Sequence, residues 1–353
     1  MIASRRPSLW VAAYTAAMPP MPISESSFHL PRSVLPTRVC ACSRSSSPLP
    51  ETDICHRKAS LSASAWHPRS GGWRFTPAWT REKSAVLDPY AALRVLAVAL
   101  FALFVGISVY VAGSFLLMRG HVGARGVGSS LREMLREALW SLRTQPFLPW
   151  YYGFGARLAK GDKTPVVVVH GYMQNRVGFI AIARRLNQRG LGPVYGFNYP
   201  WYRSVTHNSA LLGAFIERLC ETTKQDRVIL VCHSMGGLIA VHYLLHGSGK
   251  DRVLRCVTIA SPHAGVLYRG PVIGAPSRDL RKGSELLATI QGALPVPVLS
   301  IASTHDNVVY PAAQSSLEAR GGTDFVVEGP GHMAILFDRR VLDRVADFVA
   351  EGA

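Results

Sequence analysis

Charged side chains are sparse in this sequence, and acidic ones are the sparsest. Asp, Glu, Lys and Arg make up 17% of the 353 residues, whereas they make up about 25% of an average soluble protein. The 39 basic and 22 acidic side chains leave a formal net charge of +17, which favours nucleic acid or an anionic membrane surface as a partner. The sequence has no dense run of Lys and Arg. We therefore expect no nucleic-acid partner, and the membrane surface stays open.

Cysteine is also sparse, and its spacing excludes a common metal site. No two of the six cysteines form a Cys-x-x-Cys pair, so a zinc ribbon is not expected. Cys232 and Cys256 lie within apolar, strand-like runs, where a free thiol packs as a small hydrophobic side chain.

Residues 1–85 lack the hydrophobic periodicity of a folded domain. They are crowded with Ser, Pro and Arg, and no period of 2 or 3.6 residues persists in them. Such a segment cannot bury enough apolar surface to offset its ordering entropy, so we predict a disordered tail. The alternative is that the start codon was assigned too early and the stretch is not made, which an intact-mass measurement of the native protein distinguishes.

One long hydrophobic run covers residues 93–117 and contains a single charge, Arg94. At 1.5 Å per residue, a helix of this length crosses a hydrocarbon core of roughly 30 Å, so we predict a transmembrane helix. A cleaved signal peptide is the alternative, with residues 111–113 as the small-residue site. Arginines flank both ends, so the positive-inside rule gives little bias. A single anchor followed by a compact domain favours an extracytoplasmic location for that domain.

Residues 118–159 are predicted to hold a linker and an amphipathic helix. The stretch from Gly120 to Gly128 is rich in glycine, and Leu131, Leu135 and Leu139 then follow at a helical spacing of four. This helix is expected either at the membrane surface or against the following domain.

Strands and helices alternate from about residue 160, which predicts a mostly parallel sheet flanked by helices over residues 160–353. The predicted strands are 165–169, 192–199, 227–232, 254–260, 296–302 and 325–327, and the predicted helices are 179–189, 208–223, 235–246 and 340–351. Sites in such sheets form at the carboxyl ends of strands. The polar residues that come soon after the ends of strands are His170, Ser234, His263, Asp306 and His332.

Ser234 carries the strongest chemical signal. It follows the apolar run 228–232 after one residue and precedes Met235, Gly236 and Gly237, which is the pattern of a nucleophile on a sharp strand-to-helix turn. The usual motif is G-x-S-x-G, and Cys232 stands where the first Gly is expected. The plainer interpretation is a Ser that caps an ordinary helix.

Residues 164–350 resemble an α/β-hydrolase, nearest to the bacterial triacylglycerol lipases and esterases. The motifs that carry the resemblance are the His-Gly loop at 169–172, the nucleophile turn at 232–236, and the stretch 258–265, where Ser261 stands in place of the usual Thr. The resemblance covers a little over half of the chain. Residues 263–294 then fall where this fold inserts a cap, which here is small.

The resemblance implies a triad in the order Ser, acid, His. His332 lies between the last predicted strand and the last helix, where the family has its base. Asp306 follows a predicted strand and is the candidate acid, although an Asx-turn residue is its plainer interpretation. Asp324 and Asp338 are weaker candidates, because one precedes a strand and the other follows His332.

The remaining site residues follow from the same resemblance. The backbone N–H groups of Met235 and Tyr172 are the expected oxyanion donors, with Met173 as the alternative to Tyr172. Trp201, with its aromatic neighbours Tyr199 and Tyr202, is expected either to line an acyl site or to pack ordinarily. His263 is expected to line the pocket or to hold its loop, His170 to brace the oxyanion loop, and His233 to point away from the site.

The sequence therefore predicts a serine carboxylester hydrolase that works through an acyl-enzyme on Ser234, with no metal and no cofactor. An ester or lipid-like substrate suits an enzyme beside a membrane span. Two alternatives stay open: an acyltransferase or thioesterase on the same triad, and a catalytically inactive, membrane-anchored binding protein.

Overall fold

The computed structural model describes residues 65–69, 72–76, 90–122, 127–150, 157–159, 161–267 and 272–352. The chain divides into two compact units, Met1–Arg94 and Val95–Ala353. In the first unit, β1 (Ala65–Arg69) and β2 (Gly72–Thr76) form an antiparallel hairpin, which the composition did not predict. The rest of the predicted disordered tail lies outside the described residues.

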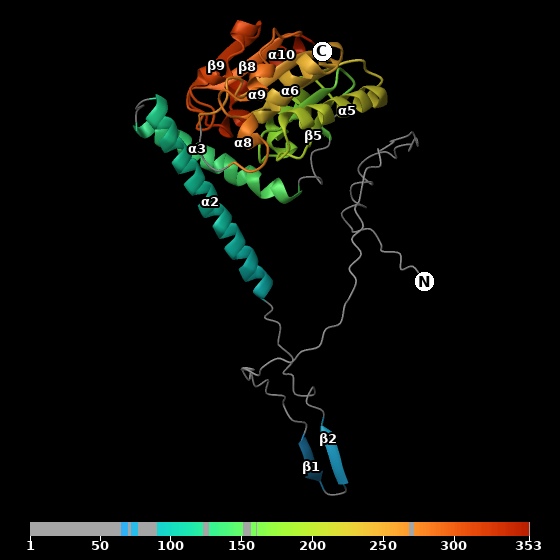
Figure 1. The fold of residues 1–353 in the computed structure, drawn as a ribbon, viewed down its shortest axis with the longest axis vertical. Helices are drawn as coiled ribbons and strands as arrows, with labels where there is room; N and C mark the ends of the chain where they lie inside the picture. The colour runs from blue at the N-terminus through green and yellow to red at the C-terminus, as the bar shows by residue number, and fades with distance from the viewer. Residues whose placement is uncertain are drawn as a thin grey trace, which may run out of the picture. The chain divides into compact units, whose positions relative to one another are not determined.

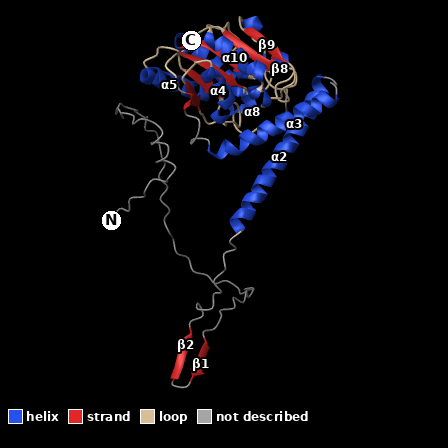
Figure 2. Ribbon diagram, turned by 180° about the vertical axis from the view of Figure 1, so that it is seen from behind, coloured by secondary structure: helices blue, strands red, loops and turns tan. Residues whose placement is uncertain are grey.

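The second unit is built on a sheet whose strand order is β3-β5-β4-β6-β7-β8-β9. Figure 2 draws its strands in red, with β8 and β9 labelled. All neighbouring strands are parallel except β3, which runs antiparallel to β5. This confirms the predicted mostly parallel sheet. The strands are β3 (Arg157–Ala159), β4 (Val166–Val169), β5 (Val194–Phe197), β6 (Val228–His233), β7 (Val253–Ile259), β8 (Val298–Ser303) and β9 (Thr323–Val327).

Helices cover both faces of this sheet (Figure 1). The side chains of β4 alternate between two cores: Val167 and Val169 join one hydrophobic cluster, and Val166 and Val168 join the other. Helices α5 (Val205–Thr223) and α6 (Met235–His246) contribute to the first cluster, and α4 (Ile180–Gln188) and α10 (Arg339–Ala350) contribute to the second. A strand buried on both faces is apolar without alternation, which explains the run of four valines.

Short helices connect these elements. The segment predicted as a small cap holds two of them, α8 (Pro276–Asp279) and α9 (Glu285–Thr289). The others are α7 (Gly249–Arg252), η2 (Gln145–Trp150), η3 (Arg176–Phe179), η4 (Ala312–Ser315), η5 (Glu318–Arg320) and η6 (Ala334–Phe337).

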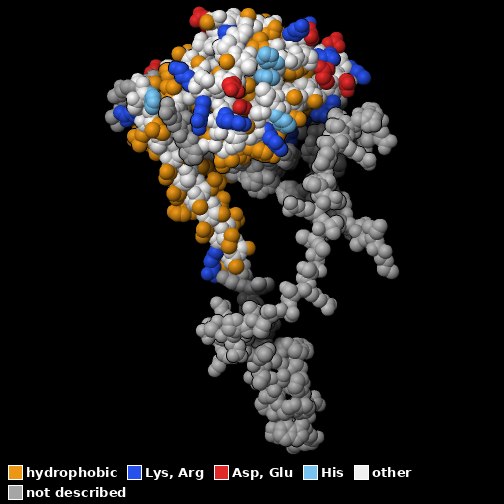
Figure 3. Space-filling model, viewed as in Figure 1, with side chains coloured by type: hydrophobic (Ala, Val, Ile, Leu, Met, Phe, Trp, Pro, Cys, Tyr) orange, Lys and Arg blue, Asp and Glu red, His pale blue; other side chains and the backbone are white. Residues whose placement is uncertain are grey.

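The long apolar helix α2 (Ala91–Val122) extends beyond the predicted span at both ends. It is long and apolar enough to cross a membrane, and Figure 3 shows hydrophobic side chains along its exposed surface. Its end at Val122 and the start of α3 (Val127–Thr144) make the linker shorter than predicted. A glycine costs a helix only about 1 kcal/mol relative to alanine, so Gly120 and Gly128 are accommodated within the two helices.

The C-terminal half of α2 packs against the rest of the second unit. Ile107, Val111, Phe115 and Met118 recur every three or four residues, share one face of the helix, and are buried with Tyr310. Met134, Ala138 and Leu142 of α3 pack against the same cluster. The loop that carries Asp306 is therefore in contact with α2.

The face of α3 that packs against the domain carries buried polar residues, and three leucines of the helix face outward. Leu131, Leu135 and Leu139 are 50%, 60% and 47% exposed. The residues buried on the opposite face are Ser130, Glu133, Glu137 and Ser141. The sequence predicted either the membrane surface or the domain as the neighbour of α3, and α3 contacts the domain through these polar residues together with Met134, Ala138 and Leu142.

Candidate active site

Ser234 lies on the turn between β6 and α6, with a backbone φ of 53° and ψ of −125°. The turn depends on small neighbours. A Cβ on Gly236 would lie 2.4 Å from the Val169 carbonyl oxygen, and a Cβ on Gly237 would lie 2.1 Å from Ser261 Oγ. Ser234 is 7% exposed. A non-glycine residue at positive φ is costly and marks a position where the surrounding structure holds a particular side chain in place.

Asp306 and His332 lie in contact, although 26 residues separate them. Asp306 follows β8 and His332 follows β9, so the parallel sheet brings both to its carboxyl edge. His332 Nδ1 lies 2.9 Å from Asp306 Oδ2 and 3.1 Å from Oδ1. Asp306 Oδ1 also accepts hydrogen bonds from the Val308 and Val309 N–H groups at 2.8 Å. Asp306 therefore forms the Asx turn and also contacts His332, while its role as the catalytic acid stays a prediction.

The other two carboxylates have different partners. Asp324 Oδ1 accepts a hydrogen bond from the Leu317 N–H at 3.0 Å. Asp338 caps α10 by accepting from the Arg340 N–H, and it also pairs with the Arg136 guanidinium at 3.2 Å. Of the three aspartates considered, Asp306 is the one that contacts His332.

Two opposing effects set the pKa of His332. Burial alone would lower the pKa of this imidazole, but the Asp306 carboxylate, through its charge and hydrogen bond, outweighs burial and raises it above the ordinary value. The Nδ1–H donates to Asp306, so the neutral ring has its lone pair on Nε2. That tautomer is the one a general base requires.

His233 connects the Ser234 turn to the His332 loop. Its Nε2 lies 2.9 Å from the His332 carbonyl oxygen and its Nδ1 lies 2.8 Å from Gln174 Oε1. Both neighbouring atoms are acceptors, so a neutral ring donates to one of them. Burial holds the pKa of His233 well below its usual range. The ring is buried behind the turn and fixes one side of the His332 loop relative to Ser234.

The loop after β4 lies against Ser234 from the other side. A Cβ on Gly171 would lie 2.8 Å from the Ser234 Cβ, so only glycine permits this approach. The Gly171 N–H donates to Gln174 Oε1 at 3.0 Å. Tyr172 follows Gly171 beside Ser234, and Met235 begins α6, where the first N–H groups of a helix have no intrahelical partner. The oxyanion roles of Tyr172 and Met235 stay predictions.

His170 supports this loop by packing and hydrogen bonding. Its ring stacks on Tyr199 with centroids 4.2 Å apart, and the Tyr199 hydroxyl donates to the His170 carbonyl oxygen. The His170 Nδ1 lies 2.9 Å from the Gly171 carbonyl oxygen. Burial lowers the pKa of His170 to about 3, so the ring is neutral and suits a bracing role.

Comparison with known families identifies the fold of this domain. A family model described as the alpha/beta hydrolase fold matches residues 164–269. This domain has the α/β-hydrolase fold. The match covers β4 through the nucleophile turn and the loop after β7.

Solved structures similar to this chain include three lipases. Lipase B of Aspergillus fumigatus is 20% identical with a TM-score of 0.49, over 57% of this chain and 55% of that one, so the chain spans about half of that lipase. A mature lipase of Bacillus licheniformis is 15% identical with a TM-score of 0.46, over 54% of this chain and 94% of that one. A monoacylglycerol lipase of Paleococcus ferrophilus is 17% identical with a TM-score of 0.46, over 56% and 98%.

An aromatic cluster lies beside the oxyanion loop of the α/β-hydrolase domain. Tyr172 and Trp201 meet edge to face with ring centroids 5.2 Å apart, and Trp201 meets Tyr202 in the same way at 5.7 Å. The Tyr172 hydroxyl accepts from the Ile273 N–H at 2.7 Å, which ties the loop to the cap segment. Trp201 is partly buried and packs against one core cluster. The cluster thus joins the oxyanion loop, the segment after β5 and the cap.

His263 is buried at the end of β7. Its Nε2 lies 3.1 Å from Thr258 Oγ1, and its buried Nδ1 has no hydrogen-bond partner within the described part of the chain. Burial lowers the pKa of His263 to about 3. Its contacts hold the loop after β7, which is one of its two predicted roles; a place in the substrate pocket stays a prediction.

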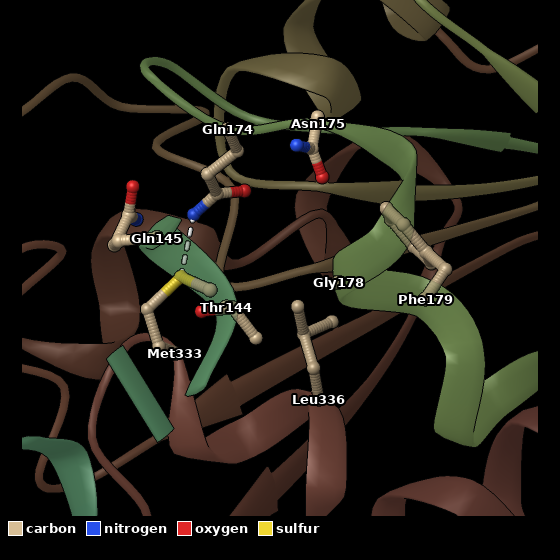
Figure 4. A pocket seen from close by; sticks show the side chains of 8 residues that line it. All are labelled: Thr144, Gln145, Gln174, Asn175, Gly178, Phe179, Met333 and Leu336. Atoms are coloured by element: carbon tan, nitrogen blue, oxygen red, sulfur yellow. Dashed lines mark hydrogen bonds between the residues drawn. The ribbon is translucent and has the colours of Figure 1, made fainter. Parts of the chain in front are cut away.

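A small pocket lies behind the His332 loop (Figure 4). Its volume of about 10 Å³ holds roughly one water molecule, so it does not accommodate an ester. Gln174 projects into it and donates from Nε2 to Met333 Sδ at 2.7 Å. The described residues contain no cluster of three or more His, Cys, Asp or Glu placed to hold a metal ion.

Three polar residues around the site were not found from the sequence. Gln174 joins Gly171 to His233, Asn307 Oδ1 accepts from the His332 N–H at 3.0 Å, and Glu137 of α3 contacts the residues after His332. Asn307 had a usable signal, since it follows Asp306 directly. Glu137 had none, because its partner Met333 lies 196 residues away, and the link from Gln174 to His233 spans 59 residues.

Replacing Gly171 with alanine is expected to reduce ester hydrolysis on the order of 10²-fold. The new Cβ would push the oxyanion loop away from Ser234, and small displacements of catalytic groups have effects of this size. Gly292→Ala is the matched control, because its Cβ would meet only Leu245 at an ordinary 3.5 Å. Steady-state kinetics and a thermal melt measure both variants. Equal activity in the two variants would contradict the placement of this loop.

Proposed function

We propose that this chain is a serine carboxylester hydrolase of the lipase or esterase type, with Ser234 as nucleophile, His332 as base and Asp306 as its orienting acid. The observation that carries the proposal is the 2.9 Å contact between His332 Nδ1 and Asp306 Oδ2 at the same edge of the sheet as the strained Ser234 turn. The α/β-hydrolase fold supports it, because the chain order is the one in which this fold carries a triad.

The reaction runs in two steps. His332 Nε2 takes the Ser234 hydroxyl proton as Oγ attacks the ester carbonyl, and the Tyr172 and Met235 N–H groups donate to the oxyanion. The tetrahedral species collapses, the C–O bond to the alcohol breaks, and His332 returns its proton to the departing alkoxide. Water then attacks the acyl-enzyme with His332 as base, and the carboxylic acid leaves as Ser234 regains its proton. Asp306 stabilises the imidazolium formed in each step.

Full-length protein in detergent is expected to hydrolyse p-nitrophenyl esters and to release the free acid. A series from acetate to palmitate separates an esterase from a lipase by the preferred chain length. Product analysis in the presence of alcohols, amines and thioesters tests the alternatives on the same triad. Formation of an acyl-acceptor adduct in place of the free acid would contradict hydrolysis, and a folded protein that turns over none of these substrates would contradict catalysis.

We further propose that α2 anchors the protein as a single-pass membrane protein, with the α/β-hydrolase domain on the extracytoplasmic side and lipid-like esters as substrates. The length and hydropathy of α2 support the anchor. The outward leucines of α3 support contact with the same bilayer, because exposed Arg132 and Arg143 flank them and pair well with anionic headgroups.

Replacing Leu131, Leu135 and Leu139 together with serine is expected to lower hydrolysis of a long-chain ester embedded in anionic vesicles several-fold. Hydrolysis of a short, water-soluble ester should stay unchanged, because these side chains point away from the domain. The loss on the embedded ester is expected because three leucines no longer bury themselves in the membrane interface, and each leucine is worth about 1.5–3 kcal/mol when fully buried. The measurement compares both substrates with reconstituted full-length protein.

A second triple variant serves as the control for that experiment. It replaces Ile180, Leu211 and Val326 with serine, which are exposed apolar residues on α4, α5 and β9. It should keep both activities. An equal loss on embedded ester in the two triple variants would contradict a membrane contact by α3.

A further inference from the structure

Glu137 is a buried carboxylate on the helix that follows the candidate membrane anchor. Its side chain reaches the loop of the α/β-hydrolase domain that carries His332, and the residue is 2% exposed. Its Oε1 accepts from the Met333 N–H at 2.8 Å, and its Oε2 accepts from the Ala334 N–H at 2.8 Å. The two bonded residues are those directly after His332. When the carboxyl is ionised, these hydrogen bonds are about twice as strong as neutral ones and hold the loop in place.

The loop also wraps closely around this carboxylate on the other side of His332. A Cβ on Gly331 would lie 2.6 Å from Glu137 Oε2. Residues 331, 333 and 334 therefore all touch one side chain, and His332 lies between them. The donors belong to the start of η6, where the N–H groups have no partner within the helix. A buried donor of this kind needs a partner from elsewhere in the chain.

The long helix α2 takes part in the same arrangement through Asn307. Asn307 Oδ1 accepts from the His332 N–H at 3.0 Å, and its Nδ2 donates to Ser114 Oγ of α2 at 2.7 Å. Three consecutive N–H groups, those of 332, 333 and 334, are thus held by side chains. Glu137 belongs to α3, and Asn307 is itself held by α2.

The charge of Glu137 acts on the imidazole as well. Burial raises the pKa of Glu137 to about 7, against the two N–H groups, which lower it. The titratable groups that act on it are His332 and Asp306, while Glu133 and Arg136 are its charged neighbours on α3. The ionised carboxylate favours the protonated form of His332 and so adds to the raised pKa of that ring. Loss of this charge would lower the pKa of His332.

We propose that Glu137 is a positioning residue for His332, so that α2 and α3 complete the active site rather than only tethering the domain. The proposal rests on the proposed function, because it concerns the base of that reaction. Support for the positioning role comes from the contacts that Glu137 makes with the His332 loop, and these contacts are not part of the ester chemistry itself. The packing of α3 on the domain then controls the placement of the imidazole over Ser234.

The test is Glu137→Gln in full-length protein in detergent, assayed on a water-soluble ester across pH. The amide accepts only one of the two N–H bonds and turns its own N–H toward the other. We expect kcat to fall about 10- to 100-fold with KM little changed, since displaced catalytic groups lose rate in this range. We also expect the acid limb of kcat/KM to move to lower pH, because the pKa of His332 falls.

Two further variants distinguish a positioning role of Glu137 from a purely structural one. Glu133→Gln is the matched control, since Glu133 is buried on the same helix one turn away and pairs with Arg136; it should keep the kcat and pH limb of the wild type. Glu137→Asp retains the charge but is one methylene shorter, so it should lose kcat without moving the acid limb. A wild-type kcat and pH profile in Glu137→Gln, or an equal loss in Glu133→Gln, would overturn the proposal.

A separate experiment tests the proposed hydrolase function independently of the role of Glu137. A fluorophosphonate probe titrates the reactive serine of the wild type in the same preparation. If the folded wild type neither hydrolyses the ester nor reacts with the probe, the hydrolase proposal fails, and the positioning proposal fails with it. If the wild type does both and Glu137→Gln only melts at a lower temperature with unchanged kcat and acid limb, positioning alone is overturned.

Discussion

Replacing Ser234 with alanine should reduce ester hydrolysis by a factor on the order of 10³–10⁶, because the residual oxyanion donors and substrate binding cannot supply a nucleophile. The fold should survive, since Ser234 lies at a turn whose close contacts involve its backbone and the neighbouring glycines. Initial rates with p-nitrophenyl esters and a thermal melt of full-length protein measure both effects.

A serine remote from this edge of the sheet provides the control for Ser234→Ala. Ser209 of α5 is buried and hydrogen-bonds to His242 at 2.9 Å, so Ser209→Ala removes a buried hydroxyl without touching the site. It should hydrolyse esters at the wild-type rate. A rate within tenfold of the wild type in Ser234→Ala would remove this residue from the mechanism.

Replacing Asp306 with asparagine should cost a factor on the order of 10³–10⁴ in kcat. The amide can still accept the Val308 and Val309 N–H bonds through its oxygen, so the loop keeps its turn. It presents a neutral group to His332, however, which loses the charge that stabilises the imidazolium and that fixes Nδ1 as the protonated nitrogen. The proton that Ser234 must release then has no properly oriented acceptor.

The pH profile of Asp306→Asn gives a second readout, because the direction in which its acid limb moves is predicted. The carboxylate raises the pKa of His332 in the wild type. Its removal lowers that pKa, so the acid limb of the residual kcat/KM should move to lower pH. Asp324→Asn is the control, because its carboxylate accepts from the Leu317 N–H and does not touch His332. An unchanged acid limb in Asp306→Asn, with normal folding, would contradict the pairing.

The sequence predicted most of the sheet and the candidate site because both depend on local patterns. The run of four valines in β4 and the step from β6 through Ser234 into α6 are continuous in sequence, and α6 begins and ends where predicted. Asp306 and His332 were noticed because each follows a strand of a predicted parallel sheet, and the family resemblance suggested their roles. Their contact, and the second role of Asp306 in its own turn, needed the structure.

The orientation of α3 was beyond sequence reasoning for a physical reason. The spacing of Leu131, Leu135 and Leu139 shows that the leucines share a face but not what covers it. The usual expectation buries these three leucines, whereas here they face outward and the buried side carries Glu137, which satisfies backbone donors of a loop 196 residues away. A long-range contact of this kind has no local signature.

The bounds of the N-terminal elements were also less predictable than those of the sheet. Glycines at 120 and 128 indicated a flexible linker, yet both lie within helices, since neither position demands a turn. The β1–β2 hairpin falls in a segment whose composition predicts disorder. Composition describes a segment on average and does not exclude a short paired stretch inside it.

The most direct test of the account is mass spectrometry of the full-length protein after reaction with a fluorophosphonate ester probe. The account predicts one covalent adduct per chain, located by peptide mapping on Ser234, and a strongly reduced rate of labelling in His332→Ala and Asp306→Asn. An adduct on another residue, or no adduct on folded protein that hydrolyses esters, would contradict the assignment of Ser234 as the nucleophile.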